Sequence, residues 1–137
     1  MKYMILTYAS QREYDGMAGK PGAPAWTPEE FGGMVEFMTK FNRELEESGE
    51  LVATYGLEAP VLSRRISGTD EIVVTDGPYA ETEEVLAGFW IVECESFDRA
   101  TEIGAKLAKC PAPAALASTT FADIRPIGES APDGPEA

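Results

Sequence analysis

Residues 72–92, IVVTDGPYAETEEVLAGFWIV, contain two strand-like runs separated by an acidic loop. The first run, residues 72–75, is β-branched throughout, and the second, residues 89–92, combines aromatic and β-branched side chains, so both are typical of β-strands. A glycine and a proline follow the first run and favour a turn there. The loop carries four carboxylates, on Asp76, Glu81, Glu83 and Glu84. We therefore expect a strand–loop–strand unit with its polar chemistry in the loop.

Helical periodicity flanks this unit on both sides. Thr27 and Glu30 form a capping box with Pro28 at the first helical position. Apolar residues at helical spacing follow, and Gly49 ends the pattern. Ser96 begins a second helix with the same apolar period, which ends before a pair of prolines. The sequence therefore predicts two amphipathic helices.

The remaining segments complete the predicted order of elements. Further strands are expected at residues 3–9, 51–57, 88–94 and 119–127, and a short hairpin arm at residues 61–68. Residues 10–26 predict a long loop, either mobile or a functional lid. The order strand, helix, two or three strands, helix, strand predicts an α+β fold of the ferredoxin-like βαββαβ type, in one domain at residues 1–127. The acidic residues 128–137 predict a disordered tail.

The predicted strands are apolar on both faces. In an antiparallel sheet with one face in water, apolar and polar residues alternate along each strand. Here Tyr3 and Ile5 alternate with Met4 and Leu6, so neither face of the first strand is polar. Two helices cover only one face, and a second subunit on the other face would remove its apolar surface from water. We therefore predict a two-fold homodimer.

Composition narrows the classes of partner and chemistry. The chain has 137 residues, a formal net charge of −13 and no histidine. The negative charge disfavours nucleic acid and anionic membranes as partners, because phosphate binding requires clustered lysine and arginine. The absence of histidine excludes Ser-His-Asp and Cys-His catalysis and histidine-ligated zinc. Without a signal peptide or an apolar spanning run we expect a cytoplasmic protein, and we expect Cys94 and Cys110 to be free thiols.

Residues 74–90, VTDGPYAETEEVLAGFW, resemble the signature of the YCII-related family, DGPF-domain type. In that signature a strand ends in a V-T-D-G-P-aromatic-A-E-T-K-E-like loop, and a Gly-aromatic strand follows. The resemblance extends from residues 2–6 to residues 124–127 and implies a dimeric α+β barrel with pockets between sheet and loops. Glu83 stands where the family commonly has lysine, so no cationic role is expected there. The family's occurrence beside, or fused to, alternative sigma factors implies a link to transcription.

Five residues are candidates for the site: Asp76, Tyr79, Glu81, Arg65 and Arg125. Asp76 ends a strand, where its carboxylate is either a partly desolvated general base or an acceptor that holds the following turn. Arg125 either neutralises a carboxylate in the dimer cavity or forms an ion pair at an edge strand. Glu81 is a ligand contact or a solvated loop charge, and Tyr79 is a ligand contact or packs the loop down. Arg65 is a second cationic point that could face inward.

Three interpretations fit these residues. The first is an enzyme without a cofactor that performs proton transfer, isomerisation or lyase chemistry on a small molecule, with Asp76 as the base and Arg125 as the anion partner. The second is a non-catalytic module that senses a ligand or binds another protein. A purely structural dimer is a third. The sequence has no phosphate-binding loop, dinucleotide fingerprint or set of metal ligands, so we expect no cofactor and no metal.

Overall fold

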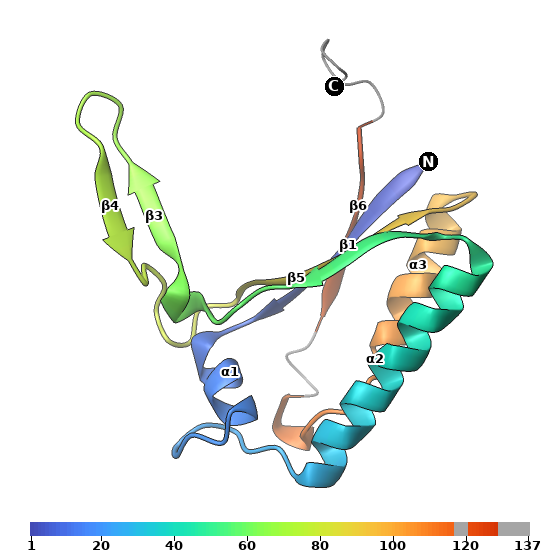
Figure 1. Ribbon diagram of the computed structural model, residues 1–137, viewed down its shortest axis with the longest axis horizontal. Helices are drawn as coiled ribbons and strands as arrows, with labels where there is room; N and C mark the ends of the chain where they lie inside the picture. Colours follow the sequence, from blue (N-terminus) through green and yellow to red (C-terminus); the bar gives the residue numbers. More distant parts are fainter. Residues whose placement is uncertain (117–120, 129–137) are drawn as a thin grey trace.

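The computed structural model describes residues 1–116 and 121–128. Its centre is an antiparallel sheet with the strand order β2-β5-β1-β6, and two helices cover one face of this sheet (Figure 1). The strands are β1 (Lys2–Ala9), β2 (Leu51–Gly56), β5 (Val85–Glu93) and β6 (Ala122–Pro126), and the helices are α2 (Pro28–Ser48) and α3 (Phe97–Leu107). These elements follow each other as βαββαβ, which confirms the predicted ferredoxin-like α+β fold.

The two covering helices begin at the predicted caps. Thr27 Oγ1 accepts a hydrogen bond from Glu30 N at 3.0 Å, and Glu30 Oε1 accepts one from Thr27 N at 2.8 Å, which completes the capping box of α2. Gly49 ends α2 with a φ of 80°, a conformation that favours glycine. Ser96 Oγ accepts from Arg99 N at 3.0 Å at the start of α3. Local sequence signals therefore determine where both helices start.

The hydrophobic core lies between these helices and the sheet. Ile5 of β1, Val92 of β5 and Ile103 of α3 have no appreciable exposure to water. Trp90 faces the same side, and its Nε1 donates to Asn42 Oδ1 of α2 at 2.8 Å. The buried indole therefore keeps a hydrogen-bond partner inside an otherwise apolar layer.

Close contact between α3 and the sheet depends on a glycine. A Cβ atom at Gly104 would lie 2.9 Å from Cδ1 of Ile124 on β6. A side chain at this position would force the Ile124 side chain to move, because such a distance is shorter than van der Waals contact. Gly104 thus allows α3 to lie directly on β6.

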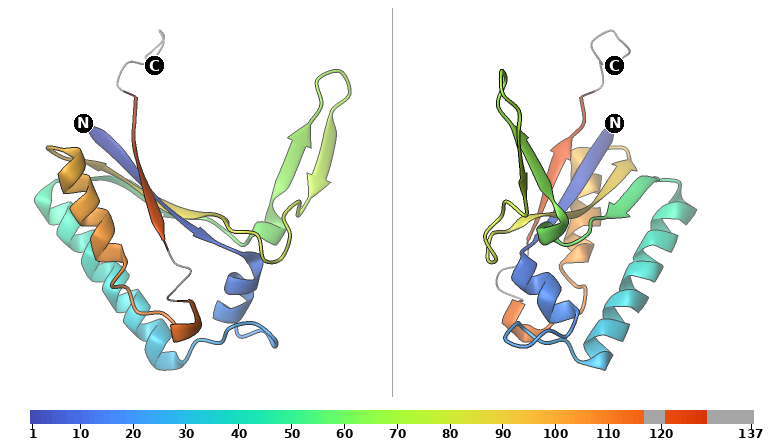
Figure 2. Two further views of the ribbon diagram at one scale, coloured as in Figure 1. Left: turned by 180° about the vertical axis from the view of Figure 1, so that it is seen from behind. Right: turned by 60° about the vertical axis from the view of Figure 1, so that its left-hand side comes forward.

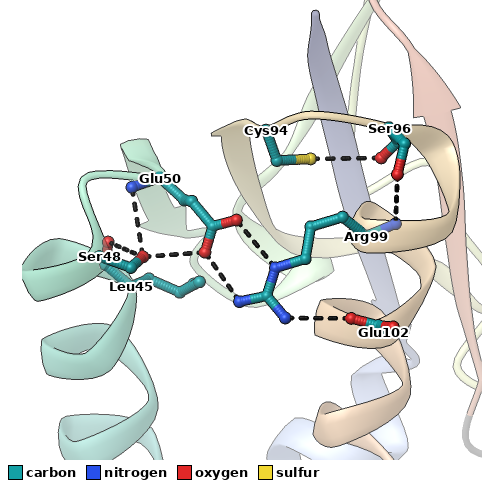
Figure 3. A network of polar contacts seen from close by, with 7 residues as sticks. All are labelled: Leu45, Ser48, Glu50, Cys94, Ser96, Arg99 and Glu102. Carbon is teal, nitrogen blue, oxygen red and sulfur yellow. Dashed lines mark hydrogen bonds and ion pairs between the residues drawn. The ribbon is translucent and has the colours of Figure 1, made fainter.

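A polar network joins the end of α2 to the start of α3 (Figure 3). Arg99 donates to both oxygens of Glu50, from Nε to Oε2 and from Nη2 to Oε1, each at 2.8 Å. Ser48 Oγ donates to Glu50 Oε1 at 2.8 Å, and Arg99 Nη1 donates to Glu102 Oε1 at 3.2 Å. The side chain of Glu50 is only 16% exposed, so this bidentate pair is shielded from water on the carboxylate side.

The expectation of an unstructured loop at residues 10–26 is wrong, because this segment contains the helix α1 (Gln11–Met17). Ser10 Oγ accepts from Glu13 N, and Glu13 Oε1 accepts from Ser10 N, both at 3.2 Å. This capping box satisfies the first backbone donors of a short helix. Gly16 lets the chain fold back over α1, because a Cβ atom there would clash with the carbonyl of Pro24.

A two-stranded arm projects from the sheet on the side away from α2 and α3 (Figure 2). It consists of β3 (Arg64–Ser67) and β4 (Val73–Asp76), and a short 3-10 helix, Pro60–Leu62, precedes it. The two strand-like runs of residues 72–92 therefore belong to different sheets. Ile66 and Val74 lie opposite each other in the arm and are 71% and 59% exposed. The arm has no core of its own, since both strands are exposed throughout.

The last predicted strand is shorter than expected where the structure describes it. Residues 122–126 form β6, which pairs with β1, and a short 3-10 helix, Ala114–Leu116, precedes this strand. Residues 119 and 120 of the predicted strand lie outside the described residues. So does the predicted tail, apart from Gly128.

Candidate functional site

Asp76 is the last residue of β4 and lies in the arm. Its Oδ1 accepts from Arg64 Nε at 3.2 Å, across the register pair that joins the two strands of the arm. The side chains of Arg64 and Asp76 are 77% and 81% exposed. In the single chain this carboxylate is therefore a solvated member of a surface ion pair. Such exposed ion pairs contribute little to stability.

Residues 77–84 form a loop that returns from the arm to β5, and we call it the DGP loop. Gly77 has a φ of 52° and donates from its N–H to the carbonyl of Ser63 at 2.8 Å. This places Tyr79 beneath Arg65, whose guanidinium carbon lies 5.2 Å from the centre of the tyrosine ring. The distance is typical of a cation–π contact. Two of the predicted site residues, Tyr79 and Arg65, thus lie together.

A pocket of about 410 Å³ lies where the arm leaves the sheet, and we call it the arm-base pocket. Its wall is mostly apolar and contains one charged side chain, that of Glu58. Tyr79 contributes an aromatic ring from the DGP loop, and Ser63 contributes a hydroxyl group. The apolar lining residues are Leu57, Ala59, Pro60, Leu62, Val85 and Leu86. An apolar wall with few polar groups is the usual composition of a small-molecule site.

The helix α1 holds the strand ends that form this pocket. Tyr14 Oη donates to the carbonyl of Leu57 at 2.8 Å, and the carbonyl of Ala87 lies 3.5 Å away. Burial raises the pKa of Tyr14, and the negative charge of Glu58 raises it further. Gln11 Oε1 accepts from Val61 N at 2.8 Å, at the base of the arm. The phenol is therefore a neutral donor that joins α1 to β2 and β5.

A second pocket, of about 260 Å³, lies between α1 and the other end of the DGP loop, and we call it the carboxyl pocket. The carboxyl groups of Glu13 and Glu84 meet there within hydrogen-bonding reach. Partial burial, followed by the hydrogen bond and the charge of Glu13, raises the pKa of Glu84 to about 7. Glu84 as a whole is exposed, so water screens this interaction. The other lining residues are Ser10, Arg12, Pro24, Thr82, Ala115 and Leu116.

Arg125 lies on the sheet face that the helices do not cover. It pairs with Met4 of β1 in the register of β6, and residues directly opposite each other share a face. Asp123, two residues away on the same face, accepts from Tyr8 Oη at 2.9 Å. This hydrogen bond is the main reason why the pKa of Tyr8 is raised. Phe121 stacks on the Tyr8 ring with a centroid distance of 5.2 Å. Arg125 thus borders a polar cluster at the edge of the open face.

The structure brings some predicted site residues together and separates others. Arg65 and Tyr79 are in contact, whereas Asp76 and Arg125 lie on different sheets of the chain. Glu81 is exposed, and its backbone carbonyl accepts from Arg12 N of α1 at 3.0 Å. This bond anchors the DGP loop through the main chain of Glu81.

Sequence reasoning missed Tyr14, Glu13 and the pairing of Glu13 with Glu84. All three follow from α1, which was expected to be a loop. The signal that could have revealed this helix is the spacing Ser10-x-x-Glu13, which has the same form as the capping box recognised at residues 27–30. The contact of Glu13 with Glu84 has no comparable signal, because it joins residues distant in the sequence.

Among residues 1–116 and 121–128, no group of three or more histidine, cysteine, aspartate or glutamate side chains could hold a metal ion. In the same residues, none of the helices combines the length and the apolar character needed to cross a membrane. Cys94 is buried and Cys110 is half-buried, and both are free thiols, as predicted.

Comparison with known proteins adds the family. A description of the YCII-related domain matches residues 1–124, a range that includes every residue lining the two pockets. An uncharacterized protein of Rhizobium meliloti (strain 1021) is 32% identical over 106 residues, which are 75% of this chain and 80% of that relative. The match and the identity agree with the resemblance of the DGP loop and its flanking strands to this family. The chain belongs to the YCII-related domain family.

Proposed function

We propose that the protein is a homodimer that binds a small organic molecule in the arm-base pocket. The second copy covers the open face of the four-stranded sheet. The observation that carries the proposal is the apolar open face, which continues toward the pocket and the arm. Arg65, Tyr79 and the DGP loop border the ligand in this arrangement.

The open face consists of rows of side chains that run across the sheet. One row joins Leu6 of β1, Phe89 of β5 and Tyr55 of β2, because each is directly opposite the next in the register. A second row joins Met4 to Ile91 in the same way. Tyr55 is 66% exposed in the single chain. Contiguous large apolar side chains on one face are typical of a protein–protein interface, and a two-fold dimer is the commonest way to cover such a face.

The arm-base pocket favours a small amphipathic ligand. Its volume of about 410 Å³ lies within the range of small-molecule sites. The carboxylate of Glu58 is the charged group in its wall, so a ligand with an amino group or another hydrogen-bond donor is favoured. The Tyr79 ring offers a flat apolar surface, and the Arg65 guanidinium lies over this ring.

Proton-transfer chemistry with Asp76 as the base is the catalytic extension of this proposal. In the single chain Asp76 is solvated and lies on a different sheet from Arg125. In the proposed dimer, the second copy would cover the Asp76 carboxylate and place its own Arg125 near the arm. Both conditions for this chemistry would then be met. The enzymatic function therefore depends on the dimer, whereas ligand binding in the arm-base pocket does not require Asp76.

A protein-interaction module is a second candidate function. The observation that favours it is the arm, whose large apolar side chains are exposed on both strands. Such a hairpin is marginally stable in water by itself, so it is suited to packing against another molecule. A partner other than a second copy would then occupy the same surface.

Light scattering at micromolar concentration tests the dimer. We expect the mass of two chains for the wild type and a shift toward one chain for Tyr55→Glu, because a carboxylate in an apolar interface is costly. Val35→Glu is the matched control, since Val35 is 46% exposed on α2, away from the open face. A folded wild-type monomer would contradict the dimer.

Mass spectrometry of the natively purified protein tests the ligand. We expect a small molecule to copurify with the wild type, and to be lost from Glu58→Gln if it carries a cation. Glu83→Gln is the control, because Glu83 does not line either pocket. If both variants retain the ligand equally, Glu58 is not part of the binding site.

A further inference from the structure

We infer that Glu13 and Glu84 form a proton-dependent latch that holds the DGP loop against α1. In the closed latch one carboxyl group is protonated and donates a hydrogen bond to the other. Loss of this proton to solvent leaves two carboxylates facing each other and weakens the attachment of the loop. The inference concerns the loop itself and is independent of the proposed ligand.

The backbone shows that the two segments are attached at this point. Arg12 N donates to the carbonyl of Glu81 at 3.0 Å, next to the carboxyl pocket. Glu13 and Glu84 both line this pocket, Glu13 from α1 and Glu84 from the end of the DGP loop. The side-chain contact and the backbone hydrogen bond therefore hold the same junction.

Hydrogen bonding indicates which carboxyl group carries the proton. Glu13 Oε1 already accepts from Ser10 N at 3.2 Å in the capping box of α1. Glu84 accepts no such bond among the described residues, and its pKa is raised to about 7. Glu84 is thus the donor and Glu13 is the acceptor.

The other charged groups near the junction do not take over the role of this proton, which is to remove the repulsion between Glu13 and Glu84. Arg12 lies on α1 and also lines the carboxyl pocket, but it is exposed. The DGP loop contributes the exposed carboxylates of Glu81 and Glu83, which add to the negative charge. Thr82 and Ser10 are neutral, and the remaining walls of the pocket, Pro24, Ala115 and Leu116, carry no charge.

The sign of the pH effect follows from the raised pKa. A carboxyl group with a higher pKa in the folded state binds its proton more tightly there than in the unfolded chain. The stabilising contribution of the latch is thus complete below the ordinary value of 4.5 and is lost as the pH rises to about 7. Tyr79 belongs to the same loop and lines the arm-base pocket, so opening of the latch also loosens one wall of that pocket.

A carbon-13 NMR titration of the glutamate carboxyl groups tests the latch in the unmodified protein. We expect the Glu84 carboxyl carbon to titrate with a midpoint of about 7. The other loop glutamates, Glu81 and Glu83, are internal references within the same spectrum. A Glu84 midpoint below about 5.5, close to that of an ordinary glutamate, would overturn the inference.

Hydrogen exchange of the Arg12 amide measures the attachment itself. We expect its protection factor, corrected for the intrinsic pH dependence of exchange, to fall at least about tenfold between about pH 5.5 and about pH 8.5. Glu84→Gln keeps a hydrogen-bond donor toward Glu13 at every pH, so its protection factor should stay constant. Glu83→Gln removes the same charge from the same loop and should behave like the wild type.

These outcomes separate the latch from a general effect of charge. If Glu83→Gln abolishes the pH dependence as fully as Glu84→Gln does, the effect comes from the net charge of the loop and the inference is wrong. Equal protection of wild-type Arg12 at both pH values would also overturn it. The Leu57 amide, which donates to the carbonyl of Ala87 at 2.7 Å outside this junction, reports any global unfolding.

Discussion

At the scale of single residues, Asp76 and Glu84 belong to one short acidic segment, but their carboxyl groups have different surroundings. Asp76 lies in the arm, where water surrounds it and Arg64 neutralises it. Partial burial raises the pKa of Glu84, and the neighbouring Glu13 carboxyl group raises it further, so Glu84 holds its proton more tightly. The sequence shows both residues as acidic neighbours of the same turn. Their difference depends on contacts with residues 12 and 71 positions away, which no local pattern reports.

Replacement of Asp76 by asparagine tests its role directly. We expect Asp76→Asn to remain folded and to change the free energy of unfolding by less than about 1 kcal/mol, because exposed ion pairs contribute little. Urea unfolding at pH 7 measures this change, and Arg64→Gln is the matched control for loss of the same pair. A loss of several kcal/mol in the proposed dimer would contradict this expectation. It would show that the second copy buries Asp76, as a catalytic base requires.

At the scale of elements, the sequence predicted α2 and α3 well because their caps and apolar periods are local signals. The same kind of signal was present for α1, but the glycines and prolines of residues 10–26 favoured a loop. A seven-residue helix has too few turns for an apolar period to be visible. Its ends therefore depend on the capping box and on hydrogen bonds to distant segments, such as that of Tyr14 Oη to the Leu57 carbonyl.

The arm shows why strand pairing was harder to predict than strand location. Residues 72–75 have a strand-like composition, and β4 occupies almost the same residues. Composition does not state which strand is the neighbour, and β4 pairs with β3 in a separate sheet rather than with a strand of the core. The register that places Arg64 opposite Asp76 is a consequence of this hairpin.

The bidentate pair between Glu50 and Arg99 predicts a pH-dependent junction of α2 and α3. The hydrogen bond from Arg99 is the main cause that lowers the pKa of Glu50. A lowered pKa stabilises the fold above the ordinary value of 4.5, and this contribution is lost as the pH falls through the lower folded-state value. We expect Glu50→Gln to destabilise the protein by about 1–3 kcal/mol at pH 7, because it removes a charge-assisted pair.

Chemical unfolding at about pH 7 and about pH 3 checks this expectation. The stability difference between wild type and Glu50→Gln should shrink at the lower pH, because the contribution of the ionised Glu50 carboxylate is lost progressively as the pH falls. Glu47→Gln, at an exposed position near the end of α2, should leave the difference from wild type small at both values. A difference for Glu50→Gln that does not depend on pH would mean that shape, and not charge, holds the junction.

At the scale of the whole molecule, the sequence predicted the fold, but the structure does not bring all the candidate site residues together. Arg65 and Tyr79 lie at the arm base, whereas Arg125 lies across the open face. Arg125 shares a face of the sheet with Asp123, which lies two residues before it on β6. Whether Arg125 meets Asp76 depends on an interface between two chains, and a single sequence contains no direct signal for that geometry.

The net charge of the chain leads to a last prediction, on how salt affects the proposed dimer. Each chain carries a formal charge of −13, so two copies repel each other as they approach. We expect the dissociation constant of the dimer to fall at least about threefold between about 0.02 M and about 0.3 M sodium chloride, because screening shortens the range of this repulsion. Analytical ultracentrifugation measures the constant, and choline chloride at equal ionic strength should have the same effect. An increase of the dissociation constant with salt would contradict this account. Ion pairs across the interface, with Arg125 or Arg65 as the cation, would then outweigh the repulsion between the two chains.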